Sequence, residues 1–135
     1  DRLLRRAGLD YHEYVKVAVH SELAACVAAL HNTATGPRRW FALSSAARNR
    51  YDSVEFAVDD VIVFGAERSG LTPAQLDELP GAMALRIPMR PDNRSLNLAN
   101  AVAVVVYEAW RQHDFEGGTH GSTTSETPAG PTFDR

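Results

Sequence analysis

Hydrophobic residues follow two different spacings along this chain, one typical of strands and one typical of helices. Runs of alternating or continuous apolar residues predict strands at residues 14–19, 40–43, 54–58, 61–64 and 83–87. Apolar residues three and four positions apart predict helices at residues 21–31, 72–79 and 97–112. Because strands and helices alternate, the pattern predicts an α/β fold with a mostly parallel sheet and flanking helices.

Polar residues at the expected helix starts support this assignment. Ser21 followed by Glu22 is typical of an N-terminal cap and a first helical turn. Thr72 followed by Pro73 has the same character, because proline is well tolerated in the first turn of a helix. Asn97 precedes the last helix, and we interpret it as a structural cap rather than as a catalytic group.

The last predicted helix, residues 97–112, is apolar nearly all the way round. Soluble proteins bury such a helix on more than one face. The loop before it is polar, and it contains Pro88, Arg90, Pro91 and Arg94. Because loops held by a rigid scaffold often carry binding sites, this loop is a candidate functional segment.

Composition and length indicate one folded domain. The chain has 135 residues, of which 44% are hydrophobic and 23% are charged, and this suffices for one domain with a core. No apolar run approaches the roughly 20 residues that span a bilayer. Cys26 is the only cysteine, so no internal disulfide can form, and a cytoplasmic location is expected.

The two ends of the chain differ from its middle. Residues 114–135 are rich in Gly, Ser, Thr and Pro, which predicts a flexible tail after a domain over residues 1–113. The chain opens on Asp1 in the middle of a patterned segment, RLLRRAGLDY. We therefore expect further sequence before it in the native protein.

The charge pattern leaves two interpretations open. The net charge of −3 argues against a nucleic-acid binder that relies on overall positive charge. The basic residues are nevertheless thirteen arginines and a single lysine, and the guanidinium fork suits phosphates and base edges. A GC-rich genome would also favour arginine. Arg2, Arg5 and Arg6 have helical spacing, and they fit either a solvated face or a phosphate contact.

Common nucleotide, metal and hydrolase motifs are missing from the sequence. It contains no GxxxxGK[ST], GxGxxG or GxSxG string and no zinc-type spacing of His and Cys, so we expect no metal. Two loops remain, FGAERSGL at 64–71 and IPMRPDNRS at 87–95, and each follows a predicted strand. Ligands in open α/β sheets bind beyond the carboxyl ends of strands, although glycine loops also serve as plain connections.

These two loops resemble a known family. FGAERSGL followed by IPMRPDNRSLNLANAVAVVVYEAWRQ is similar to the second and third signature motifs of the SPOUT superfamily of RNA methyltransferases. More narrowly, it resembles the TrmL type, the tRNA (cytidine/uridine 34)-2′-O-methyltransferases. RLLRRAGLDYHEY is similar to the segment before the second half of that fold. Long strings match in order, over about residues 2–113.

The resemblance implies a C-terminal trefoil knot that binds S-adenosylmethionine. In the family, backbone groups of three loops hold the adenine. Carried over, these loops are the strand end at Leu43, the loop at Gly65, and the segment from Ile87 to Ser95. A homodimer through the C-terminal helix is also implied, with Tyr107 at the interface near the catalytic region.

The implied reaction is methyl transfer to the ribose 2′-OH of wobble nucleotide 34 in the tRNA anticodon loop, with leucine tRNAs as the expected substrates. Such loops present unpaired bases, so local arginines can suffice for recognition. By resemblance, the candidate catalytic residues are Tyr107 and Arg94, and the candidate RNA contacts are Arg68, Arg5 and Arg6.

The family's first motif does not occur in this sequence. That motif is a strand, a PPNTGN-like loop and a helix, and its loop carries an arginine implicated in activating the ribose hydroxyl. The alternative hypothesis is therefore a non-catalytic, dimeric RNA- or nucleotide-binding module that keeps the knot.

Overall fold

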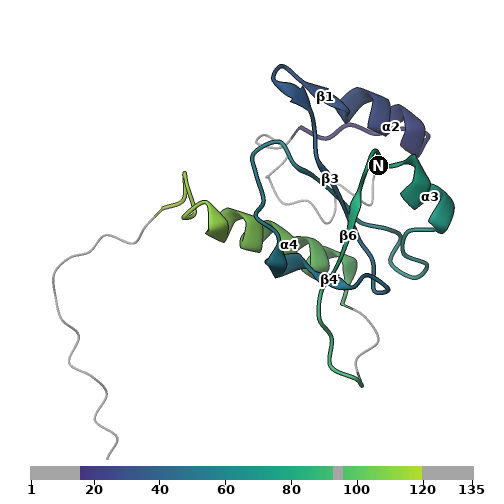
Figure 1. The fold of residues 1–135 in the computed structure, drawn as a ribbon. Coiled ribbons are helices and arrows are strands. Elements are labelled where there is room, and N and C mark those ends of the chain that lie inside the picture. Colours follow the sequence, from purple (N-terminus) through teal and green to yellow (C-terminus); the bar gives the residue numbers. More distant parts are fainter. Residues whose placement is uncertain (1–15, 93–95, 120–135) are drawn as a thin grey trace, which may run out of the picture.

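A four-stranded sheet forms the centre of the protein, in the order β4-β6-β3-β5 (Figure 1). The computed structural model describes residues 16–92 and 96–119. The strands are β3 (Trp40–Leu43), β4 (Asn49–Arg50), β5 (Val61–Val63) and β6 (Met83–Arg86). Their three pairings are all parallel, which confirms the predicted α/β architecture with a mostly parallel sheet.

Helices cover both faces of this sheet, with α2 and α3 on one side and α4 on the other (Figure 1). Their bounds are Leu23–Leu30 for α2, Pro73–Glu78 for α3 and Leu98–Gln112 for α4. Such covering explains why β3 and β5 are continuous apolar runs in the sequence.

The side-chain alternation of β3 divides the core into two clusters. Trp40 and Ala42 point to the α2 and α3 side, where they pack with Leu79. Phe41 points to the other side and packs with Val105 of α4. Each cluster therefore fastens one helical layer to the sheet by apolar burial.

The predicted caps of the last two helices are confirmed. The hydroxyl of Thr72 accepts a hydrogen bond from Gln75 N at 3.1 Å, and Gln75 Oε1 accepts one from Thr72 N at 2.9 Å. This reciprocal pair is a capping box. Asn97 Oδ1 accepts from Ala99 N at 2.9 Å at the start of α4. Both caps satisfy amide groups that a helix start leaves without partners.

The first helix begins later than predicted. Its N-cap residue is Glu22, not Ser21, and the Glu22 side chain makes no capping hydrogen bond. The preceding strand prediction, residues 14–19, is wrong for the part that the structure describes, because residues 16–20 have no strand pairing. Val17 and Val19 are 69% and 89% exposed there. Alternating valines form a strand only when a neighbouring strand pairs with their backbone.

Residues 54–58 were predicted as an edge strand, and this prediction is also wrong. Phe56 is buried, but its N–H donates to Gln112 Oε1 at 2.8 Å. Gln112 Nε2 donates to Val54 O at 2.9 Å, and His113 Nε2 donates to Phe56 O at 2.9 Å. Side chains at the end of α4 therefore satisfy backbone groups that a neighbouring strand would otherwise pair with.

Short elements also lie between the predicted strands and helices. β1 (Asn32–Thr33) and β2 (Gly36–Pro37) form a small antiparallel hairpin. The polar connector after β3 contains β4 and the 3-10 helix η2 (Tyr51–Ser53). Polar two-residue strands carry almost no periodic signal, so pattern reasoning cannot find them. Among the described residues, no helix combines the length and apolar character needed to cross a bilayer.

Candidate functional site

A pocket of about 560 Å³ lies beyond the carboxyl ends of β3, β5 and β6. Three loops and the start of α4 form its walls, through residues 43–46, 64–71, 87, 89, 96, 98 and 101. This volume is within the usual range for small-molecule sites, and the place is the one at which open α/β sheets bind ligands.

The loop after β3 forms one wall. Ser44 N donates to Leu85 O at 2.8 Å, which extends the pairing of β3 with β6 by one residue. The hydroxyl of Ser44 then accepts from Ala46 N at 3.3 Å and turns the chain. Small side chains in this turn, including Ser45, leave backbone groups accessible to the pocket.

The loop after β5 folds back on itself to form a second wall. Gly70 N donates to Ala66 O at 2.8 Å. A Cβ atom on Gly65 would lie 2.2 Å from the carbonyl carbon of Gly70 and 2.3 Å from Leu71 N. Glycine is therefore required at position 65 by the close approach of two backbone segments.

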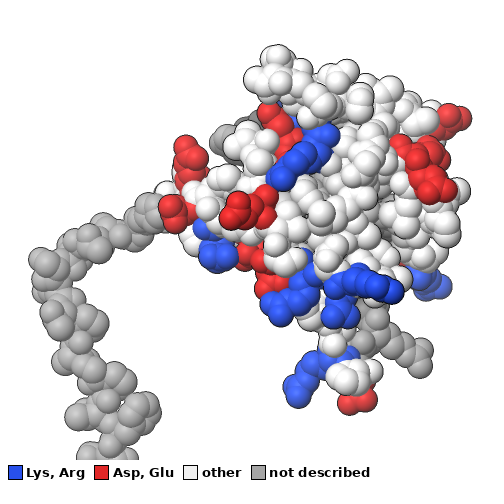
Figure 2. Space-filling view, viewed as in Figure 1, with Lys and Arg blue, Asp and Glu red and all other residues white. Residues whose placement is uncertain are grey.

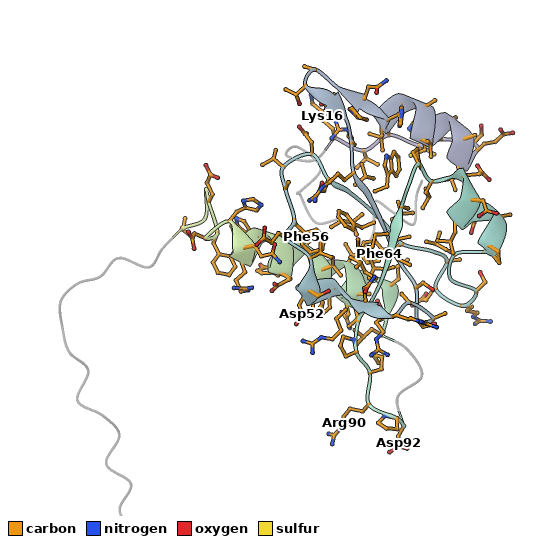
Figure 3. The ribbon with its side chains drawn as sticks, viewed as in Figure 1. Lys16, Asp52, Phe56, Phe64, Arg90 and Asp92 are labelled. Atoms are coloured by element: carbon orange, nitrogen blue, oxygen red, sulfur yellow. The ribbon has the colours of Figure 1, made fainter. Side chains whose placement is uncertain are left out.

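The loop after β6 forms the third wall and extends away from the sheet. Ile87 and Met89 line the pocket. Arg90 and Asp92 lie at the far tip of the loop, whereas Phe64 lies within the body of the protein (Figure 3). Apolar side chains on three walls, together with loop backbone, suit a flat ring system held by backbone hydrogen bonds.

Two charged residues are found in the described part of the pocket lining. Glu67 and Arg68 belong to its lining, and both are exposed. Within the described ranges, no three His, Cys, Asp or Glu side chains are grouped so as to hold a metal ion. The chemistry available from the described lining is therefore that of backbone amides, apolar contacts, one carboxylate and one guanidinium.

The strongly shifted carboxyl of the described chain lies away from the pocket, on α4. Glu108 accepts hydrogen bonds from Arg111 at 2.8 and 2.9 Å and from Gln112 at 3.1 Å. Arg111 first, and Gln112 second, lower the pKa of Glu108 to about 2, because both stabilise its charged form. We assign this group to the stability of the helix end.

Several predicted site residues come together in the pocket. Leu43, Gly65 and Ile87, expected to contact the cofactor, line it from three different loops. Arg68, expected to contact RNA, lies in the same lining. Ser45 and the other residues after Leu43 were missed by the sequence reasoning. Their available signal was a run of small residues, SSAA, directly after a buried strand.

Other predicted site residues lie elsewhere. Tyr107 is on α4, is 60% exposed and is not part of the pocket lining. Its ring packs edge-on against Trp110 with centroids 5.6 Å apart. Arg94 and Ser95 lie outside the described residues. The same holds for the candidate RNA contacts Arg5 and Arg6.

Fold and pocket together define a class of protein, namely open α/β domains that bind a ligand at the carboxyl edge of a parallel sheet. The chain belongs to the SpoU rRNA Methylase family, whose sequence profile matches residues 1–107. This confirms the resemblance on which the sequence interpretation rests.

Individual relatives give a narrower comparison. The chain is 52% identical over 118 residues to a tRNA (cytidine(34)-2′-O)-methyltransferase of Burkholderia pseudomallei (strain 1106a). This alignment covers 87% of this chain and 74% of the relative. It is 46% identical over 117 residues to the Escherichia coli (strain K12) protein of the same name, covering 87% and 71%.

Two solved structures are also similar to this chain. A putative RNA methyltransferase from Bacillus anthracis has a TM-score of 0.71 at 31% identity, covering 86% of this chain and 71% of that one. A structure concerned with the 2-OH methylation of C/U34 on tRNA has a TM-score of 0.67 at 39% identity, covering 81% and 63%.

Proposed function

We propose that this protein transfers a methyl group from S-adenosylmethionine to the ribose 2′-OH of wobble nucleotide 34 in tRNA, with leucine tRNAs as the expected substrates. The observation that carries the proposal is 52% identity, over 87% of the chain, to a relative named for 2′-O-methylation of cytidine 34 in tRNA. A pocket built from the three loops that the family resemblance selects supports it.

The pocket residues fit S-adenosylmethionine. Apolar walls from three loops suit its adenine, and the glycine at position 65 lets the loop after β5 close tightly on Gly70 and Leu71 beside the pocket. We propose that Leu43, Gly65, Ile87 and Ser95 hold it. When bound, this cofactor supplies a methyl group made electrophilic by a positively charged sulfur.

The protein's own tasks are to align the 2′-OH and to assist the loss of its proton. Arg68, in the pocket lining, is suited to bind a phosphate beside the target nucleotide. Arg5 and Arg6 are proposed as further RNA contacts. Arg94 and Tyr107 are the proposed catalytic residues, and a guanidinium near the hydroxyl would favour its deprotonated form.

A homodimer through α4 belongs to the same proposal. Ala99, Ala103, Val106 and Tyr107 are exposed and share one side of the helix. The exposed fractions of Val106 and Tyr107 are 48% and 60%. An apolar stripe on the solvent side of a packed helix supports a second protein surface. Tyr107 would act at that interface, where a partner could bring it near a bound nucleotide.

Two further parts of the proposal follow from family membership and substrate. The passage of the chain from β6 through its long loop into α4 is the part expected to form the trefoil knot of the SPOUT fold. A tRNA substrate places the enzyme in the cytoplasm, where the free thiol of Cys26 would stay reduced.

Two measurements on the full chain test the function. Titration calorimetry with S-adenosylhomocysteine should show binding, and absence of heat would contradict the cofactor assignment. Tritiated methyl transfer into leucine tRNA should label the 2′-O position of nucleotide 34. Binding of S-adenosylhomocysteine and tRNA without any transfer would instead favour the non-catalytic knotted binding module.

A further inference from the structure

The described arginines divide into two groups by their contacts. One group forms ion pairs with nearby carboxylates, namely Arg38 with Asp59 at 3.1 Å, Arg39 with Asp60 at 2.6 Å, Arg111 with Glu108 at 2.8 Å, and Arg50 with Asp52. The other group makes no ion pair with any described residue and consists of Arg48, Arg68, Arg86 and Arg90.

Each residue of the second group belongs to the pocket lining or lies within two positions of a lining residue in the sequence. Arg86 is the last residue of β6 and directly precedes the lining residue Ile87. Arg90 follows the lining residue Met89, and its side chain extends from the loop tip into open space (Figure 3). Arg48 lies directly before β4, the strand that pairs with the end of β6.

The strand order places these arginines on two sides of the pocket. β4 and β6 lie on one side of β3, whereas β5, which leads into the loop with Arg68, lies on its other side. Arg48, Arg86 and Arg90 therefore occupy the side of the pocket opposite Arg68. Figure 2 shows basic side chains gathered at the lower edge of the molecule, over β4 and the end of β6.

Local charge on this side is positive although the whole chain carries −3. Asp52 is already paired with Arg50, which leaves Asp92 at the loop tip as the nearby acid of that loop. A single exposed arginine is usually only a solvated side chain. Arg48, Arg86 and Arg90 have no carboxylate partner among the described residues, although Arg50 beside them in β4 is paired with Asp52. Several such guanidinium groups next to one pocket favour binding of an external anion.

We propose that Arg48, Arg86 and Arg90 form a basic rim that binds backbone phosphates of the tRNA anticodon arm on the β4 side of the pocket. The inference rests on the proposed function, because it assigns to that substrate the surface that holds it. With Arg68 on the far side, the rim would direct one nucleotide to the mouth of the cofactor pocket, between phosphate contacts on two sides.

The test compares two variants of the full chain that lose the same charge. The rim variant carries Arg48→Gln and Arg86→Gln, and the control carries Arg38→Gln and Arg111→Gln at ion-paired positions. Affinity for leucine tRNA is measured by fluorescence anisotropy from 50 to 300 mM KCl, and affinity for S-adenosylhomocysteine by calorimetry.

Loss of the rim charges should raise the Kd for tRNA on the order of tenfold and lower the slope of log affinity against log salt by roughly 0.7–0.9 per arginine. The control should keep both values, and both variants should bind S-adenosylhomocysteine like the wild type. Arg86→Lys, which preserves the charge, should restore most of the slope.

Three outcomes of this test lead to different conclusions about the inference and the proposed function. A rim variant that binds tRNA with the wild-type Kd and salt slope overturns the inference and leaves the proposed function intact. A loss of tRNA affinity that is equal in the control also overturns it, because the effect would then be general. A wild-type protein that binds no tRNA refutes the proposed function, and the inference with it.

Discussion

Gly65 shows how one missing methyl group shapes the pocket. The loop after β5 returns so closely that a Cβ atom at this position would lie 2.2 Å from the Gly70 carbonyl carbon. The contacted atom belongs to the backbone and an alanine Cβ has no rotamer to change, so the loop itself must open.

Gly65→Ala should therefore weaken binding of S-adenosylhomocysteine at least about tenfold, equivalent to ~1.4 kcal/mol, because the displaced loop is a pocket wall. Titration calorimetry measures the change. Val58→Ala, at an exposed position outside the pocket lining, is the control and should bind normally. Equal affinities of the wild type and Gly65→Ala would show that this loop geometry does not matter for the ligand.

Glu108 allows a prediction of pH dependence at the same scale. Its pKa in the folded protein is about 2, below the ordinary 4.5, so its stabilising contribution is present above about pH 4.5 and disappears as pH falls towards 2. Glu108→Gln should be less stable than the wild type at pH 7, and the stability difference should be several times smaller at pH 2.5. Urea unfolding at both pH values checks this, with Glu78→Gln as the control. A stability difference that does not change with pH would refute the assignment.

At the scale of elements, α4 connects the core to segments far away in sequence. Val105 is fully buried against the sheet, and Gln112 at the helix end satisfies the backbone of residues 54–56. That segment lies extended without a neighbouring strand, so the helix end substitutes for one.

Gln112→Ala should destabilise the protein by about 1–3 kcal/mol, because it leaves the amide of Phe56 and the carbonyl of Val54 without partners in a partly buried place. The free energy of urea unfolding is the measurement. Asn100→Ala, an exposed site on the same helix, should change it by less than about 0.5 kcal/mol. A similarly small effect at Gln112 would mean that water replaces its hydrogen bonds.

The exposed side of α4 gives a prediction about assembly. Tyr107→Asp should shift the proposed dimer towards monomer, because a carboxylate would be buried in an apolar interface. Light scattering coupled to size exclusion reports the mass. Val58→Asp is a matched control, since Val58 is 81% exposed and lies outside α4. An unchanged mass for Tyr107→Asp would contradict an interface through this helix.

At the scale of the whole molecule, the distribution of charge matters more than its sum. A net charge of −3 argues against a charge-driven RNA binder. The fold, however, pairs Arg38, Arg39 and Arg111 with acids and leaves other arginines beside the pocket. A protein that is acidic overall can therefore present a basic surface to RNA.

Much of the fold and part of the site could be predicted from sequence. The strand at Trp40–Leu43 and the caps at Thr72 and Asn97 were predicted correctly, because each depends on side chains within a few residues of one another. Gly65 and Ile87 were selected through family motifs, and the structure places them in one pocket.

The remainder depended on contacts between distant residues. The pairing of Phe56 with Gln112 joins positions 56 apart, and the ion pair of Arg38 with Asp59 joins positions 21 apart. No local spacing encodes such contacts. The sequence by itself therefore determined the central strands, the approximate places of the helices, the caps of the last two helices and the family. Only the tertiary structure decided that residues 54–58 stay out of the sheet and which of the described arginines form ion pairs. Both follow from the partners that folding brings together.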